Sequence, residues 1–126
     1  MAEIDIPFSP RMAEAALAGR KIATTRSHRK GDPGDIFPIE GVWFVLVDVM
    51  PTILLQVKIN FYKLEGFSSP GAFEEYWREL HDDTWVDTAE KYTHFFARCP
   101  SYTPTKDLVE ELKKREVIDA QGRWYG

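Results

Sequence analysis

The sequence predicts an α+β fold with about five or six strands flanked by helices. Three observations predict it. Two short amphipathic segments each begin with a Ser-Pro pair, the stretch 36–63 is rich in apolar and β-branched residues, and two further segments, 22–26 and 92–98, have strand-like composition. The length of 126 residues is that of one ordinary domain.

The first helix is expected to begin at Ser9, which can cap its N-terminus, with Pro10 in the first turn. Gly19 occupies the place where a left-handed residue commonly ends a helix. Residues 22–26, with the sequence IATTR, then predict a short strand.

The β-rich middle of the chain predicts three strands, with turns at Glu40-Gly41 and Met50-Pro51. Their apolar runs do not alternate cleanly with polar residues, which is typical of strands that are covered on both faces or closed into a barrel. The predicted strands are Ile36–Ile39, Val42–Val49 and Ile53–Lys63.

A second helix is expected to start near Ser69-Pro70, with Phe73, Trp77 and Leu80 forming one apolar stripe suited to core packing. After it, Asp87 and Glu90 have the spacing of a short capping box. Residues 92–98, with the sequence YTHFFAR, predict the last strand.

The chain divides into a barrel-like domain over residues 1–99 and a C-terminal helical extension over residues 100–126, which is expected to pack on the same domain. Pro100 and Pro104 precede the predicted helix 105–115, in which Leu108 and Leu112 form an apolar edge. A role of this helix in binding another protein is one open hypothesis.

The charge is unevenly distributed along the chain. The formal net charge is −4, yet residues 19–31 contain five bases and no acid, whereas residues 63–91 contain eight acids and three bases. This balance disfavours long duplex DNA as a partner and leaves room for a nucleoside or a short single strand. The bases of the first segment are Arg20, Lys21, Arg26, Arg29 and Lys30.

Other features narrow the class of protein. The single cysteine, Cys99, favours a reducing compartment, the apolar stretch 42–59 is interrupted by charged residues and a proline, and the N-terminus lacks the pattern of a signal peptide. We therefore expect a cytoplasmic protein without a membrane partner. No metal-ligand spacing or cofactor motif is present, so no cofactor is expected, and His94 is predicted to be a packed or hydrogen-bonded strand residue.

Two segments of the sequence resemble the ASCH domain family, which belongs to the PUA-like β-barrel superfamily. The first, GRKIATTR, fits the pattern Gly-x-Lys-x-x-(Glu/Thr)-x-Arg, and the second is LEGFSSPGAFEEYW at Leu64–Trp77. The resemblance covers roughly residues 6–98 and implies a partly closed barrel with a cleft that binds RNA or nucleotides. The residues that match the first pattern are Gly19, Lys21, Thr24 and Arg26.

Some bacterial ASCH proteins resemble acetylcytidine amidohydrolases, and that likeness implies a base at Lys21, a nucleophile at Thr24 and an acid at Glu65. A lysine can act as a base only when its pKa falls by roughly three units from its free value. Strand alternation places Thr24 and Arg26 on one face and Thr25 on the other.

Two functions remain open from these residues. The first is binding of RNA, a nucleotide or a nucleoside in a basic cleft, with ligand contacts from Gly19, Arg20, Arg26 and Arg29. The alternative is an amidohydrolase that deacylates a modified nucleoside such as acetylcytidine. A ribonuclease has less support, because no metal cluster or histidine pair is visible in the sequence. The oligomeric state is left open.

Overall fold

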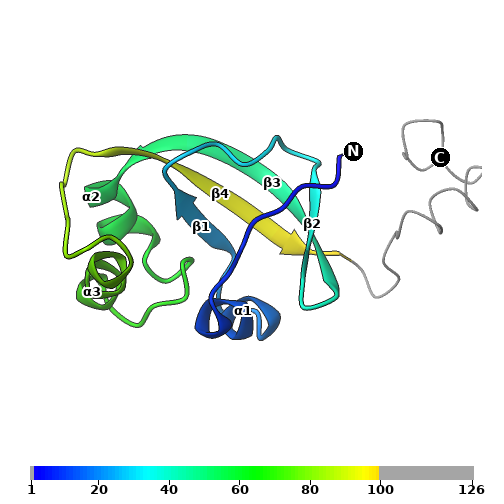
Figure 1. Ribbon diagram of the computed structural model, residues 1–126, viewed down its shortest axis with the longest axis horizontal. Coiled ribbons are helices and arrows are strands. Elements are labelled where there is room, and N and C mark those ends of the chain that lie inside the picture. Colours follow the sequence, from blue (N-terminus) through cyan, green and yellow to red (C-terminus); the bar gives the residue numbers. More distant parts are fainter. Residues whose placement is uncertain (1, 100–126) are drawn as a thin grey trace, which may run out of the picture.

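Four antiparallel strands form a curled sheet in the order β1-β4-β3-β2 (Figure 1). The computed structural model describes residues 2–99, so the extension predicted over residues 100–126, with its helix 105–115, lies outside the described residues. The strands are β1 (Ala23–Arg26), β2 (Ile36–Ile39), β3 (Val42–Ile53) and β4 (Glu90–Arg98).

The long strand β3 gives the sheet its curvature. It pairs with β2 at one end and with β4 over most of its length, and its register with β4 shifts between Leu46 and Asp48. A bulge of this kind bends a strand and increases its twist. The sheet therefore curls into a half-barrel, and the predicted α+β fold class is confirmed.

The prediction of a turn at Met50-Pro51 is wrong, because β3 continues through both residues. A proline fits here because β2 pairs only with residues 42–45 of β3, so among the described residues the edge of β3 away from β4 has no partner strand at Pro51.

The prediction of a strand over Ile53–Lys63 is also wrong. This stretch forms α2 (Leu54–Gln56) and the π-helical turn η1 (Val57–Phe61). Apolar runs do not by themselves distinguish a strand from a buried helix, and here Leu54 and Val57 lie on one helical face against the core. The described residues consequently hold four strands in place of the five or six predicted.

The two Ser-Pro starts are confirmed. Helix α1 (Pro10–Leu17) is capped by Ser9, and helix α3 (Pro70–Leu80) by Ser69, each through a bond from a backbone N–H to the serine hydroxyl. The predicted capping box at Asp87 and Glu90 is wrong, because a turn there leads directly into β4.

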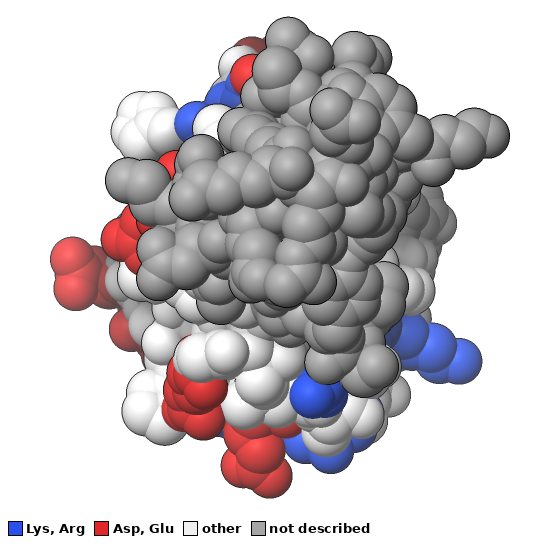
Figure 2. All heavy atoms as spheres, turned by 90° about the vertical axis from the view of Figure 1, so that its right-hand side faces the viewer, with Lys and Arg blue, Asp and Glu red and all other residues white. Residues whose placement is uncertain are grey.

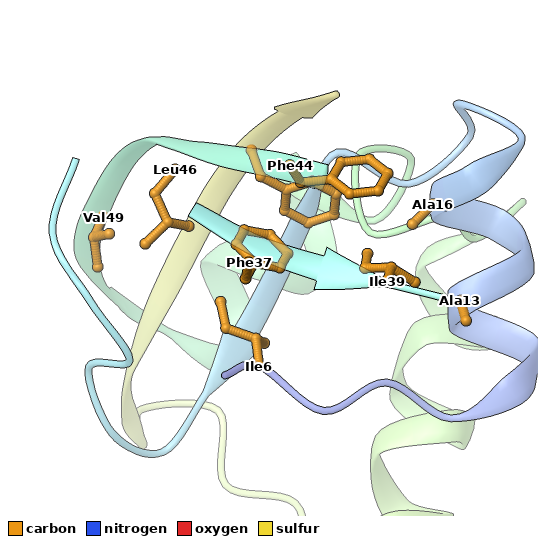
Figure 3. Packing of buried hydrophobic residues seen from close by; sticks show 9 residues of the cluster. Ile6, Ala13, Ala16, Phe37, Ile39, Phe44, Leu46 and Val49 are labelled. Carbon is orange, nitrogen blue, oxygen red and sulfur yellow. The ribbon is translucent and has the colours of Figure 1, made fainter. Parts of the chain in front are cut away.

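The buried side chains form two clusters, which we call the first core and the second core. The first core fills the space between the sheet and α1, where Phe37, Phe44 and Phe96 pack edge to face or stacked (Figure 3). The second core lies under α2, η1 and α3 and comprises Met12, Leu54, Val57, Phe67, Phe73 and Trp77.

Candidate functional site

A cavity of about 420 Å³ opens where α1, β1 and α3 meet. Its walls come from the segment leading into α1, from β1, from the loop that follows η1, and from α3. Four of its lining residues, Met12, Phe67, Phe73 and Trp77, belong to the second core. Four others, Lys21, Thr24, Thr25 and Glu65, are buried polar residues.

Gly19 ends helix α1 and directs Lys21 into the protein. Its φ of +83° is left-handed, and the amides of Gly19 and Arg20 donate to the carbonyls of Ala16 and Ala15 at 3.1 and 2.9 Å. This pair of bonds is the Schellman arrangement, in which glycine is strongly preferred. The chain turns there, and Lys21 is only 3% exposed.

The loop that carries Glu65 is held against the same turn. The Leu64 carbonyl accepts hydrogen bonds from the amides of Ile22 and Ala23 at 2.8 and 3.0 Å. Gly66 has a φ of +97°, and a Cβ there would lie 3.2 Å from the Cβ of Lys21. A glycine therefore allows both the turn and the close approach of the two segments.

Lys21 and Glu65 form a buried ion pair on one wall of the cavity. The Lys21 Nζ donates to Glu65 Oε1 at 3.1 Å and to the Glu65 carbonyl at 2.9 Å. Burial holds the pKa of Lys21 below its ordinary value; the Glu65 carboxylate opposes this shift, and the Arg26 charge adds to it. The direction is the one that a lysine base requires, although the paired carboxylate limits it.

The two neighbouring threonines of β1 both line the cavity but have different partners. Thr25 Oγ1 donates to Glu65 Oε2 at 2.8 Å, whereas Thr24 Oγ1 accepts from Arg26 Nε at 3.1 Å. Thr24 and Arg26 share a face, as strand alternation predicts. The hydroxyl that contacts Glu65 is that of Thr25, which the sequence analysis did not single out.

Arg26 carries a positive charge that, unlike that of Lys21, is not balanced by an ion pair in the cavity. Among residues 2–99 it has no ion-pair partner, and its guanidinium lies over the Phe8 ring with 5.2 Å between Cζ and the ring centroid. Burial is the main cause that lowers the pKa of Arg26, and the Glu65 carboxylate opposes it. A half-buried guanidinium with one N–H engaged by a hydroxyl suits an anionic or carbonyl-bearing ligand.

Aromatic rings also line the cavity. Phe67 packs against Phe73 and Tyr76, and the Tyr76 hydroxyl is hydrogen-bonded to Ser9 Oγ at 2.5 Å. Trp77 stacks on His81 with ring centroids 4.1 Å apart. The stripe spacing of α3 predicted core packing for Phe73, Trp77 and Leu80. Phe73 and Trp77 are buried, whereas Leu80 is 59% exposed, and the spacing did not indicate that the two rings would border a cavity.

The sequence-predicted site residues separate into two groups. Lys21, Thr24, Arg26 and Glu65 line the one cavity. Arg20 and Arg29 are exposed and lie outside it, with Arg29 paired to Asp32 at 2.8 Å, and Gly19 lines a smaller neighbouring cavity.

His94 is buried and hydrogen-bonded on both ring nitrogens, which confirms its predicted role. The amide of Lys30 donates to Nε2 at 2.9 Å, so Nδ1 carries the proton and donates to the Thr24 carbonyl at 3.2 Å. Burial lowers the pKa of His94, and the charges of Arg26 and Arg29 lower it further. The imidazole thereby ties the loop after β1 to the strand that lines the cavity.

The described residues on the face shown in Figure 2 include both acidic and basic side chains, so this part of the face is neither wholly acidic nor wholly basic. Residues 2–99 contain no group of three or more histidine, cysteine, aspartate or glutamate side chains arranged to hold a metal ion. In the same part of the chain, every helix is too short or too polar to cross a bilayer.

A curled antiparallel sheet flanked by helices defines the class of this protein as a small α+β domain. Comparison with solved structures defines the fold more closely. The ASCH domain from Lactobacillus crispatus superposes with a TM-score of 0.60 at 13% identity, covering 77% of this chain and 78% of that chain. ASCH from Zymomonas mobilis superposes with a TM-score of 0.56 at 13% identity, covering 89% and 79%.

The chain therefore has the ASCH domain fold. No protein-family model matches the sequence, and no curated protein matches it. At these identities the likeness concerns the fold alone, so function has to be argued from the cavity.

Proposed function

We propose that the cavity binds a nucleoside or a single nucleotide, either free or as an unpaired residue of RNA. The observation that carries this proposal is that aromatic rings and buried polar side chains line one cavity together. Aromatic side chains stack on any base, and buried hydrogen-bonding groups of the same cavity can read its edge.

The volume and charge support a small ligand. About 420 Å³ lies within the range of small-molecule sites. Since Lys21 is paired with Glu65, the net positive charge of the cavity comes from Arg26. One guanidinium fits one phosphate or a base carbonyl, whereas a duplex would need many more cationic contacts.

Titration of the full chain with cytidine, cytidine monophosphate and a short single-stranded RNA tests this proposal. We expect measurable binding at low salt, weakened at least tenfold by Arg26→Ala and by Tyr76→Ala. Arg20→Ala and Arg29→Ala are the matched controls for cytidine and cytidine monophosphate, because both arginines lie outside the cavity.

The same two controls measure how far the ligand extends. If these arginines contact additional nucleotides, Arg20→Ala and Arg29→Ala weaken binding of the RNA and leave binding of the mononucleotide unchanged. No binding of any of the three ligands at low salt would reject the proposal.

A second candidate is an amidohydrolase that deacylates a modified nucleoside such as acetylcytidine. The observation that favours it is the convergence of Lys21, Thr24 and Glu65 on one cavity. Amide hydrolysis needs a nucleophile, a base and a group that stabilises the oxyanion. Lys21 would first pass a proton to Glu65, to which it is hydrogen-bonded, and would then take the Thr24 proton as Thr24 Oγ1 attacks the acyl carbon. The protonated Glu65 would donate to the leaving amine of the nucleoside, and water would hydrolyse the acyl-threonine to release acetate and restore the hydroxyl. The Arg26 guanidinium beside Thr24 Oγ1 would stabilise the developing negative charge.

The two threonines allow a sharp test of this chemistry. We expect the protein to release acetate from acetylcytidine, and Thr24→Val to abolish turnover while Thr25→Val only reduces it. The opposite order would assign the attacking hydroxyl to Thr25, and turnover that survives in Lys21→Met, Thr24→Val and Glu65→Gln alike would reject these roles.

A further inference from the structure

A line of buried threonine hydroxyls leads away from Glu65 across the sheet. Thr25 Oγ1 lies 2.8 Å from Glu65 Oε2 and 2.9 Å from Thr93 Oγ1, and Thr93 Oγ1 lies 2.8 Å from Thr52 Oγ1. We call Thr25, Thr93 and Thr52 the threonine relay. They come from β1, β4 and β3, three neighbouring strands.

The far end of the relay reaches a second cavity. Thr52 lines a space of about 410 Å³ together with Gln56, Glu90, Lys91 and Tyr92, whereas Glu65 and Thr25 line the first cavity. Thr93 lies between the two, is fully buried and lines neither of them. The three hydroxyls therefore connect two separate cavities through the interior of the sheet.

Counting donors and acceptors shows which hydroxyl of the threonine relay donates to which. A hydroxyl has one proton to donate, and a carboxylate can only accept. When Glu65 is ionised, Thr25 must donate to it, so Thr25 accepts from Thr93, and Thr93 in turn accepts from Thr52. All three O–H groups then point toward Glu65.

When Oε2 of Glu65 carries a proton, the direction is free to reverse. Glu65 then donates to Thr25, Thr25 to Thr93, Thr93 to Thr52, and Thr52 to an acceptor in the second cavity. The charges that face the carboxyl group are Lys21, which is bonded to the other oxygen, and Arg26. Glu90 and Lys91 line the far cavity.

We infer that the threonine relay couples the protonation state of Glu65 to the second cavity. A proton that arrives from water at Thr52 Oγ1 releases the Thr52 proton to Thr93, the Thr93 proton to Thr25, and the Thr25 proton to Glu65 Oε2. Every oxygen keeps one proton, and the three O–H groups finish in the reversed direction. Glu65 can thus exchange its proton while a ligand fills the first cavity.

The inference builds on the site proposed above, but its test needs no ligand, so the two can fail separately. The full chain is labelled with ¹³C at the threonine methyl groups and studied by NMR at neutral pH. In Glu65→Gln the amide oxygen must face Lys21, which only donates, so the NH₂ group faces Thr25 and reverses the relay without acid.

We expect Glu65→Gln to shift the methyl signals of all three relay threonines. In a Thr93→Val background, which keeps the side-chain shape and removes the hydroxyl, the same change should shift Thr25 and leave Thr52 unmoved. Thr93→Ser should restore the response of Thr52, and Thr88→Val, at an exposed turn, should alter none of these signals.

A reciprocal measurement leaves the first cavity unchanged. Thr52→Val removes the donor to Thr93, and we expect it to shift the carboxyl-carbon signal of Glu65 when Thr93 is present and not when Val replaces it. The inference is overturned if Thr52 does not respond to Glu65→Gln, or if it responds equally with and without the Thr93 hydroxyl.

Discussion

The two cores of this protein use aromatic side chains in different ways. In the first core Phe37, Phe44 and Phe96 pack against one another, and of these three Phe44 and Phe96 also border the smaller cavity of about 270 Å³. In the second core Phe67, Phe73 and Trp77 pack on one side and border open space on the other. The buried ion pair and the threonine relay lie beside this second core.

The difference shows that packing stabilises the fold less beside the cavity than within the first core. Rings that pack on one another gain packing contacts and apolar burial. A core that borders a cavity gives up some contacts, and burying Lys21 and Glu65 beside it costs desolvation that their mutual bond only partly offsets. Such cost at one place is expected where a site must admit a ligand.

The largest expected effect comes from breaking the ion pair between Lys21 and Glu65 beside the second core. Glu65→Leu or Lys21→Met alone should lower the free energy of unfolding by about 3–5 kcal/mol, because each leaves an unpaired buried charge. The double variant should recover much of this loss. Urea unfolding of the three variants measures both effects, and strictly additive losses would show that the pair is not coupled.

Loss of a ring should cost more at Phe37, which lines none of the described cavities, than at a ring beside the cavity of about 420 Å³. Phe37→Ala should destabilise by about 3–5 kcal/mol, because the surrounding rings cannot collapse into the space. Phe73→Ala, at a similarly buried ring that borders the cavity, should cost less. Chemical denaturation of both variants provides the comparison, and equal losses would show that the second core is as tightly packed as the first.

A pH-dependent effect should follow from His94, which is neutral in the folded state. Its pKa is lowered on folding from 6.5, so the unfolded chain binds the proton more tightly. The stability contribution is full above pH 6.5 and is lost as the pH falls from there toward the folded-state pKa. Unfolding curves between pH 8 and pH 5 should show this loss, and His94→Gln should remove that part of the pH dependence.

The smallest expected effect distinguishes the two helix caps. Ser9→Ala and Ser69→Ala should each cost about 1 kcal/mol through loss of the N-cap. Only Ser9→Ala also frees the Tyr76 hydroxyl in the cavity wall. Thermal unfolding should therefore give similar losses, while binding of cytidine monophosphate should change in Ser9→Ala alone.

Local sequence signals predicted a large part of the fold. The Ser-Pro pairs marked both helix starts, Glu40-Gly41 marked the β2–β3 turn, and residues 22–26 and 92–98 marked strands, because capping and turn preferences act over a few residues. Ile53–Lys63 was misassigned because β-branched residues in an apolar run suit a strand as well as a buried helix. Tertiary packing of Leu54 and Val57 decided between them.

The candidate site, like the fold, could be predicted from local sequence only in part. The sequence by itself determined that Gly19 would end α1 and that Thr24 and Arg26 would share a face, since both follow from backbone geometry over a few residues. The family resemblance implied that Lys21 and Glu65 belong to one site. Only the tertiary structure decided that they would form an ion pair, that Thr25 would be the hydroxyl partner of Glu65, and that Arg20 and Arg29 would lie outside the cavity. These placements depend on how strands and loops some 40 to 70 residues apart pack together, and no local pattern in the chain encodes that packing.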